Sequence, residues 1–368
     1  MRVLHFYKTA LPESMGGVEQ VIDQVAQGTA RLGVQVDVLA LGQASLEGTA
    51  FHGYASYRAR KDFELASTGF SVSVFAAFAR LAQQADIVHY HFPWPFMDVV
   101  HFASRVRRPS VLTYHSDIIR QRHLLKLYRP LQDRFLGRVD RIVSTSPNYA
   151  ETSRALAPHR SKLAVIPIGL DRSSYPVPRG ERLDYWRNRF GARFFLFVGV
   201  LRYYKGLHVL LQAMALGELP VVIVGAGPVE QALREQASRL GLHQVHFVGF
   251  LNDEDKVALQ SLCHAVVFPS YLRSEAFGVS LLEGARFGKP MISCEIGTGT
   301  TYINIHGETG LVVPPGDASA LRGEMQYIWD HPNQAARMGA NAEQRYRDTF
   351  TADVMAQRYL RVYEEVVG

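Results

Sequence analysis

Two glutamates eight positions apart, Glu275 and Glu283, have a spacing that suits holding one ligand at two points. They belong to the stretch Ser270–Pro290, which reads SYLRSEAFGVSLLEGARFGKP. We predict a helix over Gly278–Arg286 with Ser274 as its N-cap, because a capping residue precedes the helix and a glycine follows it. The helical rise of 1.5 Å per residue separates the two carboxylates by about 12 Å along the axis.

The backbone at the start of this helix is a predicted anion site. The N–H groups of Phe277, Gly278 and Val279 lack helical partners, and the helix dipole is positive at this end. Gly288 is predicted to end the helix as its C′ residue. A ligand with hydroxyls at both ends and phosphate in the middle fits, and a nucleotide sugar has that shape. The alternative is a solvated helix whose glutamates only cap it.

A second candidate phosphate site follows a strand predicted at Phe194–Val198. Arg202 and Lys205 lie three positions apart on a turn that ends at Gly206. Both cations can reach one diphosphate, with Arg forking onto two oxygens and Lys acting as a point charge.

Paired glycines, Gly16 and Gly17, connect a strand predicted at Arg2–Tyr7 to a helix predicted at Val18–Leu32. Glycines at such a turn let the backbone approach a phosphate closely. The sequence has neither the G-x-G-x-x-G dinucleotide fingerprint nor a P-loop. A tight turn without a ligand is the alternative.

Histidines gather at the predicted carboxyl ends of two strands, where doubly wound sheets bind ligands. His89 and His91 end one strand, and His115 follows the next. We select His115 as the site residue, because Asp117 is close enough to orient it or to cap the next helix. A zinc site is the less favoured alternative, because no helical histidine spacing accompanies these residues.

The acidic run Asp253-Glu-Asp255 matches the D-x-D of metal-dependent sugar transferases. It opens a predicted helix directly after Asn252, where acidic residues often cap the helix and interact favourably with the positive end of its dipole. We therefore expect a capping role and no bound metal.

Short β-branched runs alternate with helical segments, which predicts βα units and parallel sheets. The pattern restarts at Arg193, so we expect an α/β fold of two Rossmann-like, doubly wound domains facing across a cleft. The predicted parts are an acceptor-side domain over 1–175, a nucleotide-sugar domain over 176–350, and a helix over 351–368 that crosses back to the first domain. Asp171–Arg187, rich in Pro, Arg and Ser, is predicted as a linker.

The stretch Ile118–Arg138 is basic and amphipathic, with Asp133 as its single acid. Such a stretch suits an anionic membrane surface, and a solvated helix face over a core stripe is the alternative. Nucleic acid is disfavoured, because no helix-turn-helix, RNP, KH or zinc-finger pattern occurs. The cations of the stretch are Arg120, Arg122, Lys126, Arg129, Arg134 and Arg138.

Composition limits the class of protein. The 368 residues suffice for two domains, and the net charge of +6 favours an anionic partner. Cys263 and Cys294 lie in apolar surroundings, which indicates buried thiols in a reducing compartment. No apolar run is long enough to span a bilayer, and the start lacks a signal-peptide pattern. We expect a cytoplasmic protein peripherally associated with the inner face of the cell membrane.

Taken together, these motifs resemble the large family of retaining GT-B glycosyltransferases numbered four, over nearly the full length. One departure is Ile168, where the family often has Asn. The run Ser293–Thr301 is most similar to bacterial O-antigen mannosyl- and rhamnosyltransferases. The matching pieces are Gly16-Gly17-Val18-Glu19, Thr113-Tyr-His115-Ser-Asp117, Ser146-Pro147, Pro167-Ile-Gly169-Leu-Asp171, Arg202-Tyr-Tyr-Lys205-Gly206, Gly225-Ala-Gly227, Phe268-Pro-Ser270 and Glu275-x₇-Glu283.

The resemblance implies roles for residues at the nucleotide and at the reaction centre. Arg202 and Lys205 would neutralise the donor diphosphate in place of a metal, so no metal cofactor is expected. Glu283 would bind the ribose hydroxyls. His115 would line the reaction centre on the acceptor side.

The resemblance also implies how the donor sugar and its phosphates are held. Glu275 and the N–H groups of Phe277 and Gly278 would hold the sugar and the phosphate. Gly16 and Gly17 would close over the phosphates from the other domain, which requires domain closure.

The implied reaction is retaining transfer of a hexosyl unit, mannose or a deoxy relative, from GDP-mannose or GDP-rhamnose to a lipid-linked oligosaccharide. Such a reaction would serve surface polysaccharide or O-antigen synthesis. The alternatives are a GT-B enzyme with another nucleotide sugar and a soluble acceptor, a non-catalytic nucleotide-sugar-binding partner, and a nucleotide-sugar epimerase.

Overall fold

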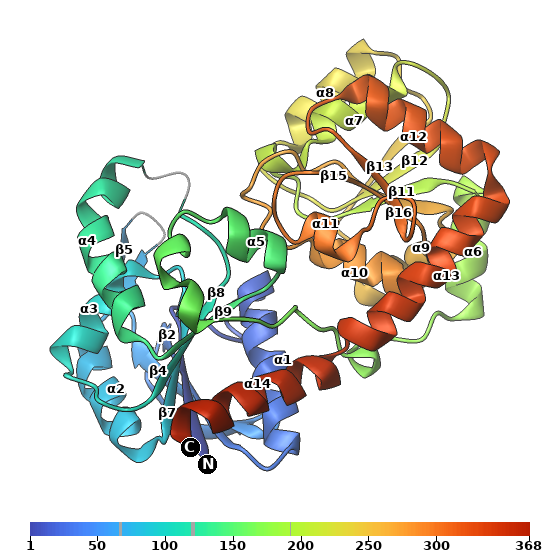
Figure 1. Cartoon of the computed structure of the whole chain (residues 1–368). Coiled ribbons are helices and arrows are strands. Elements are labelled where there is room, and N and C mark those ends of the chain that lie inside the picture. The colour runs from blue at the N-terminus through green and yellow to red at the C-terminus, as the bar shows by residue number, and fades with distance from the viewer. Residues whose placement is uncertain (66–67, 119–121, 192) are drawn as a thin grey trace. The chain divides into compact units, whose positions relative to one another are not determined.

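The computed structural model describes residues 1–65, 68–118, 122–191 and 193–368 (Figure 1). It divides into two compact units, each built on its own parallel sheet. The first unit comprises Met1–Gly169 together with Ala352–Gly368, and the second comprises Leu170–Thr351. None of the helices in these described ranges is long and apolar enough to cross a membrane.

The first unit holds an eight-stranded sheet in the order β10-β9-β8-β7-β1-β2-β4-β3. Every neighbouring pair is parallel except β3 with β4. β5 and β6 form a separate antiparallel pair. The strands are β1 Arg2–Phe6, β2 Gln35–Gly42, β3 Leu46–Phe51, β4 Tyr54–Arg60, β5 Phe63–Leu65, β6 Thr68–Phe70, β7 Ile87–Phe92, β8 Ser110–Tyr114, β9 Arg141–Ser144 and β10 Leu163–Val165.

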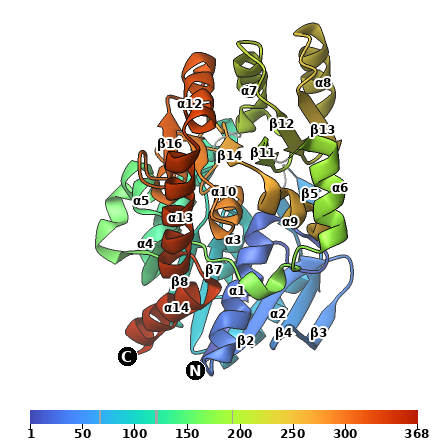
Figure 2. The ribbon, with the colours of Figure 1, turned by 90° about the vertical axis from the view of Figure 1, so that its right-hand side faces the viewer.

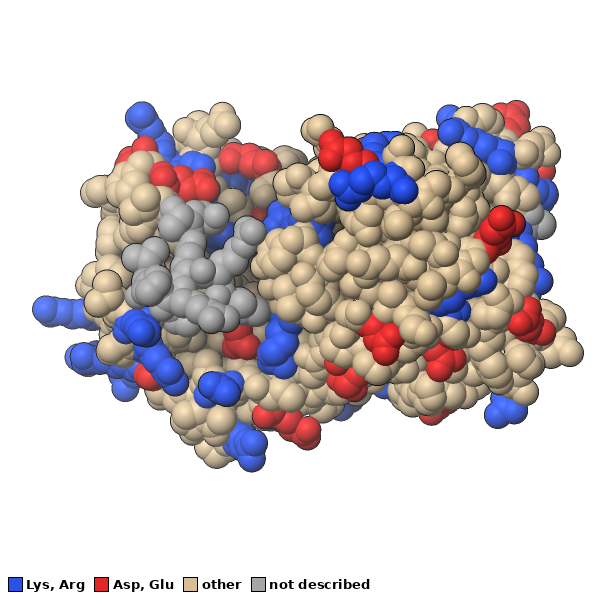
Figure 3. Space-filling model, turned by 90° about the horizontal axis from the view of Figure 1, so that it is seen from above, with Lys and Arg blue, Asp and Glu red and all other residues tan. Residues whose placement is uncertain are grey.

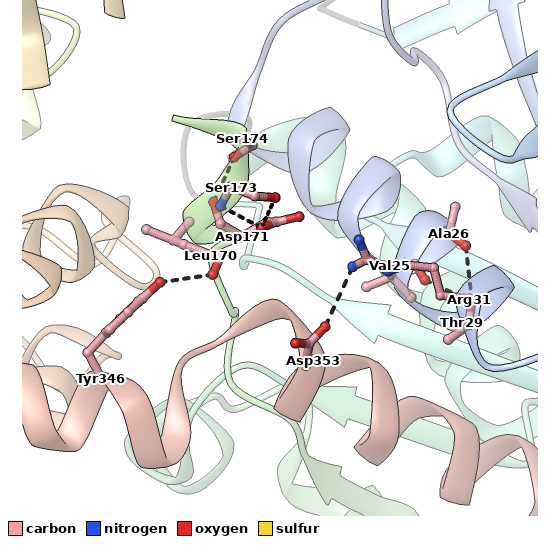
Figure 4. Close-up of polar contacts among 10 residues, drawn as sticks. All are labelled: Val25, Ala26, Thr29, Arg31, Leu170, Asp171, Ser173, Ser174, Tyr346 and Asp353. Carbon is pink, nitrogen blue, oxygen red and sulfur yellow. Dashed lines mark hydrogen bonds and ion pairs between the residues drawn. The ribbon is translucent and has the colours of Figure 1, made fainter. Parts of the chain in front are cut away.

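Helices cover both faces of this sheet (Figures 1 and 2). The last helix of the chain, α14, lies against α1. Arg31 pairs with Asp353 at 3.6 Å (Figure 4), and a Cβ on Gly28 would lie 2.6 Å from Cβ of Ala356. Glycine therefore lets the two helices approach closely. The helices are α1 Gly17–Arg31, α2 Ser73–Gln84, α3 Pro95–Ala103, α4 Arg122–Arg138, α5 Pro147–Thr152, η1 Ala157–Lys162 and α14 Ala352–Val367.

The second unit holds a six-stranded sheet in the order β13-β12-β11-β14-β15-β16, parallel throughout. Most of its strands are short, mainly apolar and buried, as expected of strands covered on both faces, whereas the edge strand β13 is only partly buried. The strands are β11 Phe195–Val198, β12 Val221–Val224, β13 Val245–Gly249, β14 Ala265–Phe268, β15 Met291–Cys294 and β16 Gly310–Val313.

The helices of the second unit also cover both faces of the sheet (Figure 2). They are η2 Arg172–Ser174, α6 Gly180–Phe190, η3 Tyr203–Lys205, α7 Leu207–Met214, α8 Glu230–Arg239, α9 Asp253–Leu262, α10 Val279–Arg286, α11 Thr300–Ile303, α12 Ala318–Asp330 and α13 Pro332–Thr349. The predicted α/β organisation with two Rossmann-like parallel sheets is thus confirmed.

The prediction that Asp171–Arg187 is a linker is wrong for much of this segment, because the segment contains η2 and most of helix α6. Asp171 accepts hydrogen bonds from the backbone and hydroxyl of Ser173, which starts the first short turn (Figure 4). Trp186 on α6 is buried and donates to Asp255 at 3.0 Å. One buried aromatic thus fixes a helix whose other residues are mostly polar.

Candidate active site

The start of α10 lies later in the chain than its predicted N-cap. Gly278, not Ser274, is the N-cap, and its φ of +100° is in the region that favours glycine. The segment before it forms a turn, in which the N–H of Glu275 donates to the carbonyl of Leu272 at 3.0 Å. A Cβ on Gly278 would lie 3.1 Å from Cδ1 of Leu281, so the site is sterically tight as well.

The end of α10 is as predicted. Gly288 is the C′ residue with a φ of +62°. Its N–H donates to the carbonyl of Ala285 at 2.9 Å, and the N–H of Lys289 donates to Gly284 at 3.1 Å. This pair of bonds is a Schellman motif, which satisfies the last carbonyls of the helix.

The first N–H groups of α10 have no recorded partner within the described part of the chain. They belong to Phe277, Gly278 and Val279. The hydroxyl of Ser280 donates to the carbonyl of Val198 at 2.8 Å instead, which ties α10 to the carboxyl end of β11. The positive end of the helix dipole can therefore accept an anion beside the turn that follows β11.

Lys205 and Glu275, predicted site residues 70 positions apart, are in direct contact. Nζ of Lys205 lies 2.5 Å from Oε2 of Glu275, and the two side chains are only 12% and 11% exposed. The ammonium group also lies 4.8 Å from the ring centre of Phe268. Ser270 donates to the same carboxylate oxygen at 3.4 Å. The contacts hold a cation at a fixed position next to a carboxylate.

Arg202 precedes this pair on an extended backbone and is exposed. No ion pair or side-chain hydrogen bond of its guanidinium is recorded among the described residues. The turn that carries it is fixed by Gly206, at φ +70°, where a Cβ would lie 1.9 Å from the carbonyl oxygen of Pro269. A rigid turn thus presents a cation that is available to a ligand.

Glu283 is buried on α10, and both of its carboxylate oxygens are occupied by partners that the sequence did not reveal. The hydroxyl of Tyr175 donates to Oε1 at 3.1 Å, and Nε2 of Gln260 donates to Oε2 at 3.0 Å. Burial, and then the charge of Glu283, raise the pKa of Tyr175 well above its usual range. The guanidinium of Arg286 lies 4.0 Å from the tyrosine ring centre. Each carboxylate oxygen can accept a second hydrogen bond, so Glu283 retains capacity for a ligand hydroxyl.

Gly16 and Gly17 lie at the start of α1 in the first unit, where Gly16 is the N-cap. A Cβ on Gly16 would lie 2.3 Å from Oε2 of Glu19, whereas one on Gly17 would meet nothing within 4 Å. Glu19 is buried and accepts from the hydroxyls of Thr9 and Ser14 at 2.6 and 2.9 Å. Gly16 therefore makes room for a buried carboxylate that fixes the loop, and Gly17 leaves open space at the helix N-terminus.

His115 follows β8 and is 6% exposed. Its expected orientation by Asp117 is wrong: Nε2 of His115 lies 3.1 Å from Nδ1 of His91. Asp117 instead accepts from the hydroxyls of Tyr114 and Ser153 at 2.9 and 2.8 Å. Burial lowers the pKa of His115 to about 3, so its ring is neutral near pH 7.

The acidic run Asp253–Asp255 forms the first turn of α9, and the residue that caps this helix is Asn252. The side chain of Asn252 accepts from the N–H of Asp255 at 2.9 Å. Asp255 itself accepts from Trp186, and Asp253 pairs with Lys256 at 2.7 Å. These acids are therefore engaged in holding α6 and the first turn of α9.

Comparison with known proteins agrees with this arrangement. The sequence model of group 1 glycosyl transferases matches residues 186–345, and that of glycosyltransferase family 4 matches residues 15–174. The chain is 61% identical to D-rhamnosyltransferase WbpZ of Pseudomonas aeruginosa over 96% of its own length and 93% of that protein. It is 48% identical to O-antigen chain mannosyltransferase C of Escherichia coli over 99% and 98% of the two chains.

Solved structures show the fold. Sucrose-phosphate synthase of Thermosynechococcus elongatus superposes with a TM-score of 0.80 at 20% identity, over 99% of this chain and 98% of that one. Anabaena HepE in complex with UDP gives 0.77 at 20% identity, over 99% and 100% of the two chains. The chain therefore belongs to the group 1, family 4 glycosyltransferases and is a glycosyltransferase with the GT-B fold.

Proposed function

We propose that the protein is a retaining hexosyltransferase of O-antigen or related surface-polysaccharide synthesis. It transfers mannose or a deoxy relative such as rhamnose from a GDP-sugar to a lipid-linked oligosaccharide. The names of the two relatives, one a D-rhamnosyltransferase and one an O-antigen chain mannosyltransferase, support the sugar class and the pathway class. The observation that carries the proposal is the Lys205–Glu275 pair beside the partnerless N–H groups that begin α10.

In this proposal the second unit binds the donor without a metal. Arg202 and Lys205 neutralise the diphosphate, and the first N–H groups of α10 hold its oxygens. Glu275 binds the sugar hydroxyls, and Glu283 binds the ribose hydroxyls through its remaining lone pairs. The cations replace a divalent metal, since they supply fixed positive charge where the leaving group develops negative charge.

The proposed chemistry occurs on one face of the sugar. The bond from the anomeric carbon to the diphosphate oxygen breaks, and the acceptor hydroxyl oxygen bonds to that carbon on the same face. The departing diphosphate oxygen takes the hydroxyl proton, so no side chain is required as a nucleophile. Lys205 and Arg202 stabilise the charge on the leaving diphosphate, and the configuration at the anomeric carbon is retained.

We further propose that α4 associates with an anionic membrane surface, where a lipid-linked acceptor is located. Its predicted basic stretch lies partly outside the described residues, because 119–121 are not described. On the described part, Lys126, Arg129, Arg134 and Arg138 are exposed, and Leu127 is 82% exposed. Basic side chains project from the edge of the first unit that α3 and α4 form (Figure 3).

A surface hollow of about 440 Å³, termed here the arginine hollow, lies between the end of α3 and the end of α4. No acidic residue lines it, and no ion pair of its four arginines is recorded among the described residues. An anionic headgroup would supply the missing negative charge. The hollow is lined by His101, Phe102, Arg105, Val106, Arg107, Arg134, Gly137 and Arg138.

The test of the donor assignment is a thermal-shift titration with GDP, UDP, ADP and their sugar conjugates in the presence of EDTA. A ligand that binds only the native state raises the unfolding temperature by mass action. Selective stabilisation by GDP and GDP-mannose is the expected result. Selective stabilisation by UDP or ADP species would discard the GDP-sugar donor, and stabilisation only after metal addition would discard metal independence. No shift with any nucleotide would favour a non-catalytic partner.

A further inference from the structure

Four histidine rings are buried side by side in the first unit, next to α14. His5 lies on β1, His89 and His91 lie on the neighbouring β7, and His115 follows β8. His5, His89 and His91 are 0% exposed. The parallel register places His5 opposite His89, and the rings of His89 and His91 stack at 4.3 Å between centres.

Three of the rings form one hydrogen-bonded chain, termed here the histidine relay. Nδ1 of His5 lies 3.0 Å from Nε2 of His91, and Nδ1 of His91 lies 3.1 Å from Nε2 of His115. The relay therefore runs across three adjacent strands, from the interior to the carboxyl end of β8. His89 is stacked beside it but bonds elsewhere, to the hydroxyls of Tyr363 and Thr113, both at 2.7 Å.

The protons in this chain can be counted. Burial lowers the pKa of His5 to about 3 and that of His91 well below its usual range, so the rings are neutral near pH 7. A neutral imidazole has one N–H and one lone pair, so all the bonds in the relay must point the same way. Either every N–H points toward His115 or every N–H points toward His5.

The two ends of the relay decide the direction. Nε2 of His5 is fully buried and has no hydrogen-bond partner. A relay that points inward would leave an N–H at this atom, and a buried unpaired donor is costly. Nδ1 of His115 makes no recorded hydrogen bond to a described residue, and it is not among the fully buried partnerless atoms. An N–H at that end can therefore reach water or a ligand.

We infer that His5 and His91 are positioning residues that hold His115 in its Nδ1–H tautomer. His115 then presents a hydrogen-bond donor, not a base, at the carboxyl end of β8. The inference rests on the proposed placement of His115 on the acceptor side of the reaction. There the Nδ1–H would hydrogen-bond an oxygen of the substrate, and the acceptor proton would go to the departing diphosphate.

A metal ion is the competing explanation of the cluster, because one ring nitrogen from each of His5, His89 and His91 lies within 4.8 Å of the others. The hydrogen bonds oppose this explanation. Both ring nitrogens of His89 are taken by hydroxyls, and both of His91 face other imidazoles. Metal coordination would have to break at least two of these four bonds, one at His89 and one at His91.

The test is NMR spectroscopy of the full chain with ¹⁵N-labelled histidine and no substrate, using two-bond ¹H–¹⁵N correlations that report the tautomer of each ring. The His115→Gln variant assigns the signals of His115. At pH 7 we expect protonated Nδ1 and unprotonated Nε2 for His115. A wild-type spectrum with Nε2–H at His115, or with averaged nitrogen shifts, would overturn the inference without any variant.

A substitution should also reverse the direction of the hydrogen bonds in the histidine relay. His5→Met places a weak acceptor with no donor next to Nε2 of His91, so the relay should reverse and His115 should become the Nε2–H tautomer. The matched control is His101→Phe, a buried histidine that bonds to Tyr90 at 2.7 Å outside the relay, which should leave the tautomer of His115 unchanged. An unchanged tautomer in folded His5→Met would contradict a role for His5.

Two further readouts separate the explanations. If the purified protein contains stoichiometric zinc and the signals of His5, His89 and His91 are shifted, the cluster is a metal site and not a hydrogen-bonded relay. In transfer assays His5→Met should lower kcat about tenfold while donor affinity is unchanged, and a purely structural defect would change both. The tautomer spectra need no substrate, so a failure of the proposed transferase activity leaves the positioning result readable.

Discussion

At the residue scale, the contact between Lys205 and Glu275 determines how the proposed donor site is organised before a donor arrives. Each side chain is nearly buried, so either charge alone would carry a large desolvation penalty if its partner were absent. The ammonium group is held at one position by its carboxylate partner and by the ring of Phe268. A bound diphosphate would share this cation with Glu275, and no reorganisation of the lysine would be required.

Replacement of Lys205 by Ala should lower kcat about 100- to 1000-fold, as is typical when one fixed charge-stabilising group is removed. It should also lower the unfolding temperature, because the carboxylate of Glu275 loses its cation in a nearly buried position. Steady-state transfer kinetics and a thermal melt measure the two effects. Lys256→Ala is the control, since it removes a lysine that pairs with an acid on α9. If Lys205→Ala turns over at the wild-type rate, Lys205 does not contribute to the reaction.

Replacement of Glu283 by Ala should raise the dissociation constant of the nucleotide about 10- to 100-fold, since hydrogen bonds to a charged group contribute about 1.5–3 kcal/mol. Calorimetric titration with the nucleotide gives this constant directly. Tyr175→Phe serves as the comparison, because it removes a partner of the carboxylate and keeps the carboxylate itself. If both variants weaken binding equally, Glu283 acts through Tyr175 and not on the ribose.

At the element scale, α10 depends on a glycine in the left-handed region at its start. Gly278→Ala should destabilise the second unit by about 1–2 kcal/mol, because a Cβ is strained at positive φ. It should also weaken donor binding, since the free N–H groups of the first turn would move. Gly323→Ala within α12 is the matched control, where a Cβ meets nothing within 4 Å and a gain of about 0.5–1 kcal/mol is expected. Urea unfolding and donor titration distinguish the two glycines.

We assign the proposed membrane association to α4 and the arginine hollow. The double variant Arg134→Gln with Arg138→Gln should bind anionic vesicles about 30-fold more weakly, because each cation near such a surface contributes about 1 kcal/mol. Co-sedimentation with vesicles containing phosphatidylserine or phosphatidylglycerol measures this. The same two changes at Arg234 and Arg239 on α8 should have no effect. Equal binding of both double variants would show that the attraction is due to net charge alone.

The sequence predicted those elements whose signal is local. The strands predicted at Arg2–Tyr7 and Phe194–Val198 were found within one residue, because each is a compact apolar run. β3 and β4 were missed because β3 is mostly exposed and β4, YASYRAR, is not a compact apolar run. α6 was missed because Pro and Arg obscure its one buried anchor, Trp186. Helix α10 was placed nearly correctly, but its N-cap was not, since a serine is a good cap only where the backbone allows it.

Contacts between distant positions could not be predicted from local patterns. Glu283 and Tyr175 are 108 positions apart, and no motif connects them. His5 is one histidine inside an apolar strand, RVLHF, and its neighbours His89 and His91 become adjacent to it only through the strand order. The sequence thus indicated which residues are candidates for the chemistry but not what orients them.

At the scale of the whole molecule, the buried neutral histidines make the first unit sensitive to acid. The pKa is lowered to about 3 for His5 and His115 and to about 4 for His101, chiefly by burial. The unfolded chain takes up protons at these groups below about pH 6.5, and the folded chain does not. The contribution of these histidines to the free energy of unfolding is therefore fully present above pH 6.5 and decreases as the pH falls. Each histidine lowers the free energy of unfolding by about 2 kcal/mol between pH 6.5 and pH 5.

This dependence can be measured by the fluorescence of Trp94, which is buried in the first unit and is the only tryptophan left after Trp186→Phe and Trp329→Phe. The urea midpoint should fall between pH 6.5 and pH 5. It should fall less in the same protein with His5→Met, because one proton fewer is taken up on unfolding. Parallel curves for the two proteins would show that His5 is not neutral and buried in solution.

The packing of α14 against α1 affects when the first unit can complete its fold during translation. The second unit begins at Leu170 and ends at Thr351, and these two residues are bridged, so the chain leaves the first unit and returns to it at neighbouring points. The face of α1 that α14 covers stays uncovered until residues 352–367 have left the ribosome. A premature stop codon shortly before Ala352 would therefore damage the first half of the protein, which is already fully translated.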